Sequence, residues 1–450
     1  MPRPLRSALP AFAALAALAA CDPDATLDDR LAAAIAPYDA APLPPKPALD
    51  PERVALGRLL FFDPVLSGNR DTSCATCHHP RFGTGDALSV SVGTGGLGLG
   101  PDRQLGPDRG LIPRNAPEVY NRGTSLWTTM FWDSRVTHNP DGTFTSPAGA
   151  ALPAGLDSVL AIQAMFPVTS RDEMRGLPGD LDVFGAPNEL AAFADTDWAG
   201  LWAALMERLL ALDGYAERFA RAFPDVPPAE LGFEHAALAL AAFEADAFTF
   251  TDSPWDRWLR GERDALTDAQ KRGALVFYGE AGCADCHSGA LMTDQKTWSL
   301  CVPQIGPGKG AAAPWDIGHG AVTGAAADRF AFRTPPLRNV DHTGPWMHDG
   351  AYTSLEDAVR HHLDPVGALR RYDPSALRAD VRDTLQDDEE LMGEMLATLP
   401  PELREARTLD DRAMADLLAF LSALTDPASL RLGPVTPVAV PSGLPVDRGL

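Results

Sequence analysis

The chain contains two strings with the spacing C-x-x-C-H, one at residues 74–78 and the other at residues 283–287. This spacing is typical of covalent haem c attachment, in which two thiols bond to one porphyrin and the histidine becomes the proximal iron ligand. Two such strings predict two haem c groups, and therefore a protein that moves electrons. The residues that would hold these groups are Cys74, Cys77 and His78 in the first string and Cys283, Cys286 and His287 in the second.

Three other uses of paired cysteines, in zinc sites, thioredoxin-like motifs and disulfides, explain less of this pattern. The two pairs of a four-thiolate zinc site usually lie about 15–20 residues apart, whereas residues 78–282 separate the pairs here. A thioredoxin-like motif would explain either pair, but not the histidine that follows both. A disulfide within a pair is a further alternative, and the two-residue gap would make its loop strained.

Length and charge limit the class of protein. The length of 450 residues fits roughly two to three domains, so we expect one haem per domain. The net charge of −23 argues against a nucleic-acid partner, because no basic patch is available to neutralise phosphates. An acidic surface instead suits a basic soluble electron carrier, which it would attract electrostatically.

Residues 1–20 predict an export signal. Arg3 and Arg6 precede an apolar run that is too short to span a bilayer. The run ends in Leu-Ala-Ala before Cys21 and resembles a bacterial lipobox, which implies cleavage before Cys21 and lipidation of its thiol. An ordinary signal peptide followed by a chance cysteine is the alternative. We therefore expect a periplasmic, membrane-tethered lipoprotein of a bacterium.

Capped helices are expected before both C-x-x-C-H strings. Asp50 and Pro51 begin the first helix, and Thr267 with Gln270 forms a capping box for the second. The repeated order of helix, short loop and string indicates internal duplication. Because no alternating β pattern dominates, we predict a mainly α fold with two cytochrome c-like haem domains and long loops.

The expected domain organisation follows from these elements and from composition. Cys301, the cysteine outside both strings and the lipobox, receives no role. The expected segments are a signal peptide at 1–20, a Pro/Ala-rich tether at 21–49, an N-terminal haem domain at 50–250, a C-terminal haem domain at 251–430 and a Pro-rich tail at 431–450.

Further motifs surround the two strings in a fixed order. They are GRLLFFD at 57–63, RNAP at 114–117, FWDSR at 131–135, a stretch from Gln163 to Met174, FRTPPLRNV at 332–340 and MHDG at 347–350. In this order, over roughly residues 50–430, they resemble the bacterial di-haem cytochrome c peroxidase/MauG family. The resemblance implies a haem peroxidase whose N-terminal haem is peroxidatic and whose C-terminal haem transfers electrons.

The resemblance also implies roles for individual residues. Trp132 matches a tryptophan that lies between the two haems and serves as an electron bridge. Gln163, Pro167 and Glu173 match the pocket over the first haem, where Glu173 would be the acid/base. The ordinary alternatives are a core tryptophan and a solvated surface glutamate.

Two further sets of residues match positions close to the haems. Asn115, Thr343 and Pro345 match a calcium site between the domains, the last two through their carbonyl oxygens. Arg333 and His348 match residues that contact the haems, at their propionates. Asn115 could instead cap a turn.

The chain departs from the family pattern at both distal positions. Thr94 stands where many members have a histidine that closes the first haem, so we expect an open face there. His362 aligns with the methionine or tyrosine ligand of the second haem, so we expect bis-histidine ligation and a lower potential. Only one of the neighbours His361 and His362 should reach the iron, and Met347 and Met292 are the other candidates.

The leading prediction is a periplasmic peroxidase that reduces hydrogen peroxide to water with electrons from a small cytochrome c or cupredoxin. Glu173 would move the proton and Gln163 would orient the peroxide. The first alternative is a MauG-like enzyme that oxidatively modifies a partner protein. The second is a non-catalytic di-haem electron carrier, which would not need these two side chains. Because family members are often dimers, the resemblance also implies a homodimer.

Overall fold

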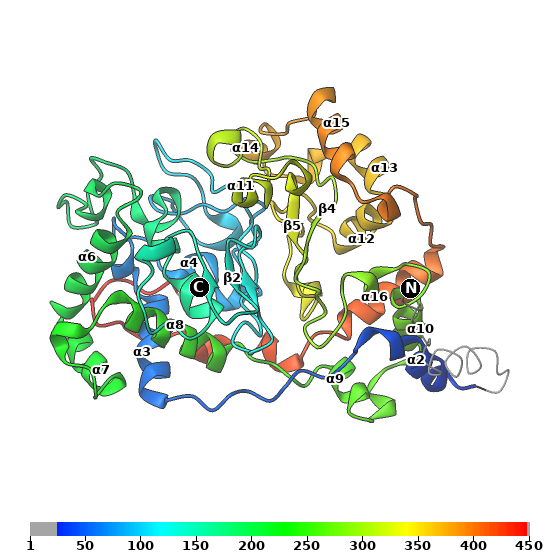
Figure 1. Ribbon diagram of the computed structural model, residues 1–450, viewed down its shortest axis with the longest axis horizontal. Helices are drawn as coiled ribbons and strands as arrows, with labels where there is room; N and C mark the ends of the chain where they lie inside the picture. Colours follow the sequence, from blue (N-terminus) through cyan, green and yellow to red (C-terminus); the bar gives the residue numbers. More distant parts are fainter. Residues whose placement is uncertain (1–24, 448–450) are drawn as a thin grey trace, which may run out of the picture.

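The computed structural model describes residues 25–447, so the expected lipidation site at Cys21 lies outside the described residues. Two lobes lie side by side in Figure 1, an N-terminal lobe built mainly from residues 51–247 in blue to green and a C-terminal lobe built mainly from residues 254–422 in green to red-orange. Each lobe has its own hydrophobic core. A smaller cluster, which includes Val90 and Val302, joins buried residues of both lobes. Helices far outnumber short strands, which confirms the predicted mainly α class.

The N-terminal lobe is built from helices around the first C-x-x-C-H string and one small antiparallel sheet, ordered β1-β2-β3. Its elements are α3 (Pro51–Phe62), α4 (Cys74–Cys77), α5 (Val159–Ala164), α6 (Trp198–Leu210), α7 (Asp213–Ala222), α8 (Phe233–Ala247), β1 (Thr129–Met130), β2 (Val136–His138) and β3 (Phe144–Thr145).

The C-terminal lobe repeats the helical pattern around the second string, with β4 and β5 paired antiparallel. Its elements are α9 (Pro254–Leu259), α10 (Asp268–Phe277), α11 (Gly320–Thr323), α12 (Leu355–Leu363), α13 (Pro365–Arg370), α14 (Ala379–Arg382), α15 (Glu389–Thr398), α16 (Asp411–Ser422), β4 (Thr297–Ser299) and β5 (Ala331–Arg333).

One helix crossing is repeated in both lobes. The helix before each string packs against a later helix, α3 on α8 and α10 on α16. At each crossing a glycine on the first helix lets its backbone contact the backbone of the second helix. A Cβ on Gly57 would lie 1.8 Å from the carbonyl oxygen of Ala239, and a Cβ on Gly273 would lie 1.8 Å from that of Asp416. The same close approach at the same place confirms the expected internal duplication.

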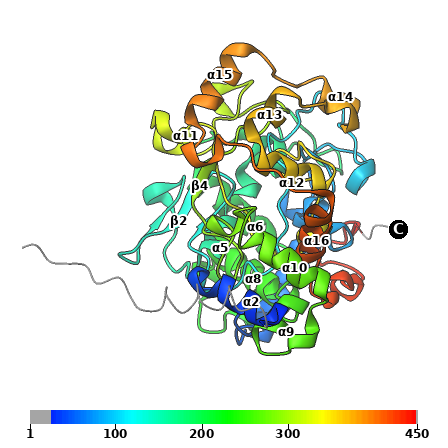
Figure 2. The same ribbon diagram turned by 90° about the vertical axis from the view of Figure 1, so that its right-hand side faces the viewer.

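The first described segment does not behave as the expected tether. Residues 27–35 form α2 (Leu27–Ile35), which packs on α10 of the distant C-terminal lobe (Figure 1 and Figure 2). Leu31 is fully buried there, and Asp28 accepts hydrogen bonds from Trp258 and Lys271. Burial of this apolar face outweighs the Pro/Ala-rich composition that suggested a tether.

The Pro-rich end of the chain crosses in the opposite direction, from α16 back to the N-terminal lobe (Figure 1). Leu432, Val440 and Leu444 are buried in the N-terminal core. Ser442 donates a hydrogen bond of 2.6 Å to Asp63. The first described residues are therefore anchored on the C-terminal lobe, and the last described residues are anchored on the N-terminal lobe. Between residues 25 and 447 we find no helix with the length and apolar character to cross a bilayer.

Candidate functional site

Each C-x-x-C-H string lines a cavity inside its own lobe. The first cavity, of about 170 Å³, is lined by Cys74, Cys77 and His78. The second cavity, of about 190 Å³, is lined by the corresponding residues of the second string. The five cysteines between residues 25 and 447 are free thiols, so no disulfide closes either pair. Within the same residues no three His, Cys, Asp or Glu side chains gather as a metal site, which leaves the zinc alternative without support.

The thiols are unsuited to redox exchange. Burial raises the pKa of the Cys74 thiol and of the Cys283 thiol to about 12. Thiolates are the reactive form, and redox-active cysteines have a lowered pKa. The raised pKa values argue against a thioredoxin-like centre, and haem attachment at both C-x-x-C pairs stays a prediction.

The two string histidines are oriented in the same way. Nδ1 of His78 lies 3.2 Å from the carbonyl oxygen of Thr84, and Nδ1 of His287 lies 3.3 Å from that of Met292. An Nδ1–H bond to a carbonyl is the usual partner of a metal-binding imidazole, because it leaves Nε2 as the ligand. Burial lowers the pKa of His287 to about 4, which keeps its ring neutral.

A second histidine faces His287 across the second cavity. The ring of His362 lies 6.2 Å from that of His287, centroid to centroid, and its Nδ1 lies 2.8 Å from the carbonyl oxygen of Ala358. Metal–imidazole bonds of about 2 Å put the centroids of two axial rings roughly 6 Å apart. The separation therefore fits one iron between the two rings.

The neighbouring residues explain why only one histidine of α12 is free. His361 is bound at both nitrogens, with the Tyr352 hydroxyl 2.8 Å from Nδ1 and the Leu300 carbonyl oxygen 2.7 Å from Nε2. Met292 does not line the second cavity, whereas Met347 does.

Unpaired polar groups at the cavities fit a carboxylate-bearing ligand such as a haem. His348 lines the second cavity, stacks on Phe332 at 3.5 Å and has no hydrogen-bond partner at either ring nitrogen. The nearby Asp349 Oδ2 is 3.9 Å from its Nε2, beyond hydrogen-bond distance. Arg122, which lines the first cavity, has Nη1 unpaired. Propionates are the kind of group that would satisfy these atoms.

A shared wall separates the two cavities. Asn115, Glu118, Trp132 and Arg333 line both. The indole N–H of Trp132 donates to the carbonyl oxygen of Asn115 at 3.0 Å, and the Arg333 amide donates to the carbonyl oxygen of Trp132 at 2.7 Å. The indole expected as an electron bridge is thus held rigidly between the two sites.

The first cavity carries the polar side chains expected for proton transfer. Glu173 lies in a π-helical turn, Arg171–Arg175, while Gln163 belongs to α5 and Pro167 to the following turn. All three line the cavity, as expected from the sequence. Burial raises the pKa of the Glu173 carboxyl, and the ammonium of Lys309 opposes that rise.

Thr94 supports this turn instead of facing the cavity. Its amide donates to the carbonyl oxygen of Glu173 at 2.9 Å, and its hydroxyl donates to Asp71 at 2.7 Å. Among the described residues, His78 is the one histidine in the lining of the first cavity, and Met130 and Met174 line it as well.

Sequence reasoning missed a buried ion-pair network that joins the lobes beside the first cavity. The guanidinium of Arg114 donates to both oxygens of Asp316, at 2.6 and 2.9 Å, and Nη1 lies 2.7 Å from Asp133. It also missed Lys309, which reaches the first cavity from the C-terminal lobe. Arg114 stands inside the RNAP motif at 114–117, but no periodic pattern marks residue 309.

The residues expected to bind calcium come together at the second cavity. Asn115, Thr343 and Pro345 all belong to its lining. The Asn115 amide nitrogen donates to the carbonyl oxygen of Leu88 at 2.7 Å, which leaves its side-chain oxygen available. Calcium binding here stays a prediction.

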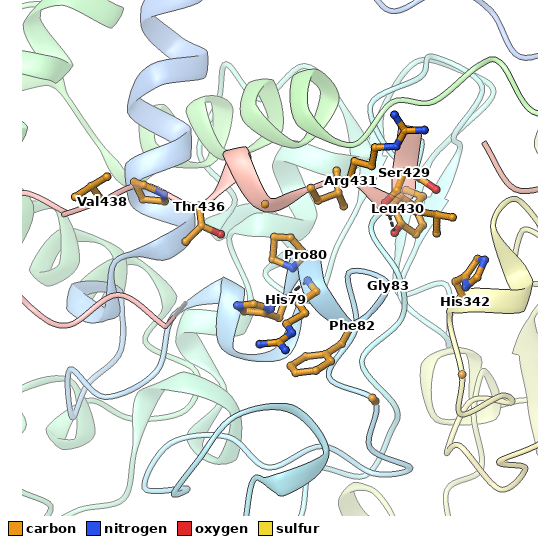
Figure 3. Close-up of a pocket in the computed structure, with 17 residues that line it drawn as sticks. His79, Pro80, Phe82, Gly83, His342, Ser429, Leu430, Arg431, Thr436 and Val438 are labelled. Carbon is orange, nitrogen blue, oxygen red and sulfur yellow. Dashed lines mark hydrogen bonds between the residues drawn. The ribbon is translucent and has the colours of Figure 1, made fainter. Parts of the chain in front are cut away.

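An open groove of about 540 Å³ lies outside both cavities, and Figure 3 shows the side chains that line it. It shares no lining residue with either cavity, but His79 follows His78 directly and Gly344 lies between two residues of the second lining. Its lining includes Arg81 and Arg431, and no carboxylate or cysteine. The two cavities, and not this groove, hold the chemistry described above.

Comparisons with known proteins agree with this arrangement. The profile of the family described as di-haem cytochrome c peroxidase matches residues 51–264. The chain is 32% identical to the methylamine utilization protein MauG of Methylorubrum extorquens, over 88% of this chain and 84% of that protein. It is 31% identical to the cytochrome c551 peroxidase of Pseudomonas aeruginosa, over 68% of this chain and 69% of that protein.

Solved structures show the same fold. One is a MauG-like protein associated with microbial copper homeostasis, with 27% identity, a TM-score of 0.59 and coverage of 89% of this chain and 97% of that chain. The diheme peroxidase BthA from Burkholderia thailandensis has 23% identity and a TM-score of 0.57, with coverage of 89% and 91%.

Proposed function

The chain belongs to the di-haem cytochrome c peroxidase family of haem oxidoreductases, and we propose that it reduces hydrogen peroxide to water in the first cavity with electrons that enter through the second. The observation that carries this proposal is the difference between the two linings. The second cavity has two histidines 6.2 Å apart, whereas the first has His78 together with Glu173 and Gln163. A closed site suits electron storage, and an open site suits a reactant.

Each cavity would hold one haem c. Cys74 and Cys77 would attach the first haem, with His78 as its proximal ligand. Cys283, Cys286 and His287 would do the same in the second cavity, with His362 as the distal ligand, and the unpaired ring of His348 suits a propionate. A haem with a free coordination position supplies peroxide binding and electrons for O–O cleavage, while the protein supplies orientation and proton transfer.

Glu173 would carry the proton. Its ionised carboxylate would accept a proton from one oxygen of hydrogen peroxide and return it to the other oxygen, which leaves as water. The overall reaction consumes one peroxide, two electrons and two protons and yields two waters. Its raised pKa brings the carboxyl closer to the operating pH, which favours both steps. The Gln163 amide would orient the peroxide, and Pro167 would shape the cavity.

Electrons would reach the first cavity through Trp132, the indole in the wall shared by both cavities. The donor would be a small periplasmic cytochrome c or cupredoxin, and the net charge of −23 favours a basic one. A lipid on Cys21 would keep the enzyme on a membrane surface, and a homodimer is the expected assembly. A calcium ion on Asn115, Thr343 and Pro345 would stiffen the wall between the lobes, and chelation would then slow transfer between the haems.

Steady-state peroxide reduction tests this function directly. Full-length protein loaded with both haems is mixed with hydrogen peroxide and a reduced small cytochrome c, and oxidation of the donor is followed optically. We expect rapid, peroxide-dependent oxidation. The proposal would be rejected if the donor were oxidised no faster than in a mixture of donor and peroxide without the protein.

A second candidate is favoured by two residues that depart from the peroxidase pattern. Thr94 is bound to Asp71 and cannot close the first site, and His362 replaces the usual ligand of the second. The MauG protein of Methylorubrum extorquens is 32% identical to this chain, and a MauG-like protein of solved structure has the same fold. A MauG-like enzyme would form a long-lived oxidised state with peroxide and turn over small donors slowly, so stopped-flow spectra separate the two candidates.

A further inference from the structure

Lys309 reaches the first cavity from the opposite lobe. It lies in a loop between β4 and α11 and lines the cavity together with Glu173. The loop is tightly held, because the Lys309 amide donates to the carbonyl oxygen of Trp315 at 3.0 Å and the Asp316 amide donates to Gln304 at 2.8 Å. The bidentate pair of Asp316 with Arg114 then fixes the loop onto the N-terminal lobe.

Four charged side chains act electrostatically on Lys309: Glu173, Asp133, Arg114 and Arg135. Asp133 is already paired with Arg114 at 2.7 Å and with Arg135 at 3.0 Å. Within residues 25–447, neither Glu173 nor the Lys309 ammonium belongs to an ion pair within 4.0 Å or to a side-chain hydrogen bond. Glu173 is therefore available to a small polar molecule, and so is the Lys309 ammonium. Glu244 is a second carboxylate of this lining without an ion pair or side-chain hydrogen bond among the described residues, and burial raises its pKa to about 8.

We propose that Lys309 is a positioning residue for proton transfer, whose ammonium keeps Glu173 ionised and ready to accept a proton from the substrate. This inference rests on the proposed function of the first cavity. It also means that a cation of the C-terminal lobe lowers the pKa of the acid/base carboxyl of the N-terminal lobe. Proton transfer in the first cavity then depends on correct docking of the two lobes.

A lysine suits this role better than an arginine would. The two guanidiniums nearby serve in ion pairs with Asp133, so they are less available to balance Glu173. An ammonium is a compact charge on a flexible stem, and it can approach a carboxylate without a fixed planar geometry. The chain has only four lysines, at positions 46, 271, 296 and 309, and this one lines the cavity.

Burial and the two arginines lower the pKa of Lys309 to about 8, while Asp133 and Glu173 raise it. The side chain is therefore cationic below about pH 8. Removing its charge should raise the pKa of Glu173, because an opposite charge nearby lowers a carboxyl pKa. The peroxidase needs the ionised form, so activity rises with pH through this pKa, and its acid limb should move to higher pH.

The test uses full-length protein loaded with both haems and four variants. Lys309→Met and Lys309→Gln remove the charge, Lys309→Arg keeps it, and Lys296→Met removes the charge of an exposed lysine of the same lobe. Infrared difference spectra follow the Glu173 carboxyl against pH, with the Glu173→Gln protein as the blank. This readout does not depend on turnover.

We expect the neutral variants at position 309 to raise the pKa of Glu173 by roughly one unit. The acid limb of peroxide turnover should move by the same amount, while Lys309→Arg and Lys296→Met should leave both unchanged. An unchanged titration in Lys309→Met and Lys309→Gln would overturn the inference, as would an equal shift in Lys309→Arg. If the infrared shift appears but wild-type protein does not reduce peroxide, the proposed function fails and the coupling of Lys309 to Glu173 stands.

Discussion

Under the proposed function, Glu173 and His362 give two similar cavities different chemistry. His362 stands 6.2 Å from His287, a spacing that fits a metal held between two imidazoles. Glu173 stands in a cavity with one histidine, where burial raises its pKa. An imidazole pair closes a site to reactants, whereas a carboxyl beside an open position can transfer protons. The functional difference between the lobes therefore depends on a few side chains.

Replacing Glu173 by glutamine should remove the proton carrier without changing the size of the side chain. General acid–base catalysis contributes about 10²–10⁴-fold to a rate, so peroxide reduction should fall by a factor in that range. Donor oxidation kinetics give the factor, and the haem content measured by pyridine haemochrome spectra should stay at two per chain. The same change at Glu189, whose half-exposed carboxylate pairs with the buried Arg208 and lines neither cavity, is the control. Full activity of Glu173→Gln would rule out the acid/base role.

His362→Ala should convert the second haem from a low-spin to a high-spin or water-ligated form, because one axial imidazole is lost. The change is read from the optical and electron paramagnetic resonance spectra of the oxidised protein. His361→Ala is the matched control. That ring is bound to Tyr352 and to the Leu300 carbonyl, so its loss should leave the spin state unchanged. A low-spin signal that survives in His362→Ala would place the ligand at another residue, such as Met347.

At this scale the sequence predicted what spacing alone can carry. The C-x-x-C-H strings are local patterns, and each lines a cavity. The place of Gln163 and Glu173 in the first cavity was implied by the family resemblance, and both residues line it. Lys309 could not be predicted, because its role comes from a loop that folds back onto the other lobe. Thr94 was correctly expected not to be a ligand, but its bond to Asp71 depends on tertiary structure.

Both lobes contain the same helix crossing next to their C-x-x-C-H string. α3 meets α8 and α10 meets α16 so closely that neither Gly57 nor Gly273 can gain a side chain without moving the backbone opposite. This contact fixes the helix that leads into each attachment string. A larger residue would therefore disturb the cavity as well as the core.

Gly57→Ala and Gly273→Ala should each destabilise the protein by about 1–3 kcal/mol or more, since a methyl group would be forced against a carbonyl oxygen. The free energy of unfolding is measured by urea denaturation of the haem-loaded protein. Gly393→Ala is the control, because that glycine lies inside α15 and a Cβ there meets nothing within 4 Å. The control should be neutral or stabilising by up to about 1 kcal/mol. Equal effects at all three glycines would contradict the close-packed crossing.

Elements were easier to predict where a cap and a periodic pattern coincide. Asp50 caps α3, and Thr267 with Gln270 caps α10, both as expected. The helix α2 was missed, although Thr26 and Asp29 form a capping box at its start. The surrounding prolines and alanines suggested a tether, and the sequence gives no sign of the distant surface on which Leu31 is buried.

At the scale of the whole molecule, the two lobes are held together by chain ends that cross and by ion pairs at the first cavity. α2 binds the C-terminal lobe, and the last residues bind the N-terminal lobe. Arg114 links Asp133 of one lobe to Asp316 of the other while lining the first cavity. The arrangement keeps Trp132 in a wall common to both cavities, which is the position that the proposed electron bridge needs.

Asp316→Ala should cost about 3–5 kcal/mol of stability, the range for removing one partner of a buried ion pair. It should also slow electron transfer between the haems, because Arg114 and the loop of Lys309 lose their anchor. Urea denaturation and pulsed reduction followed optically measure the two effects. Glu394→Ala breaks the partly exposed pair with Arg329 and should cost less than about 1 kcal/mol. An Asp316→Ala protein as stable as this control would show that the pair does not hold the lobes.

The inequality of the two haem sites is the central claim, and the electron paramagnetic resonance spectrum of the resting, fully oxidised protein tests it most directly. One haem ligated by His78 with an open face should give a high-spin ferric signal, and one ligated by His287 and His362 should give a low-spin signal of equal weight. Two low-spin signals would mean that both irons are closed, which would contradict the account.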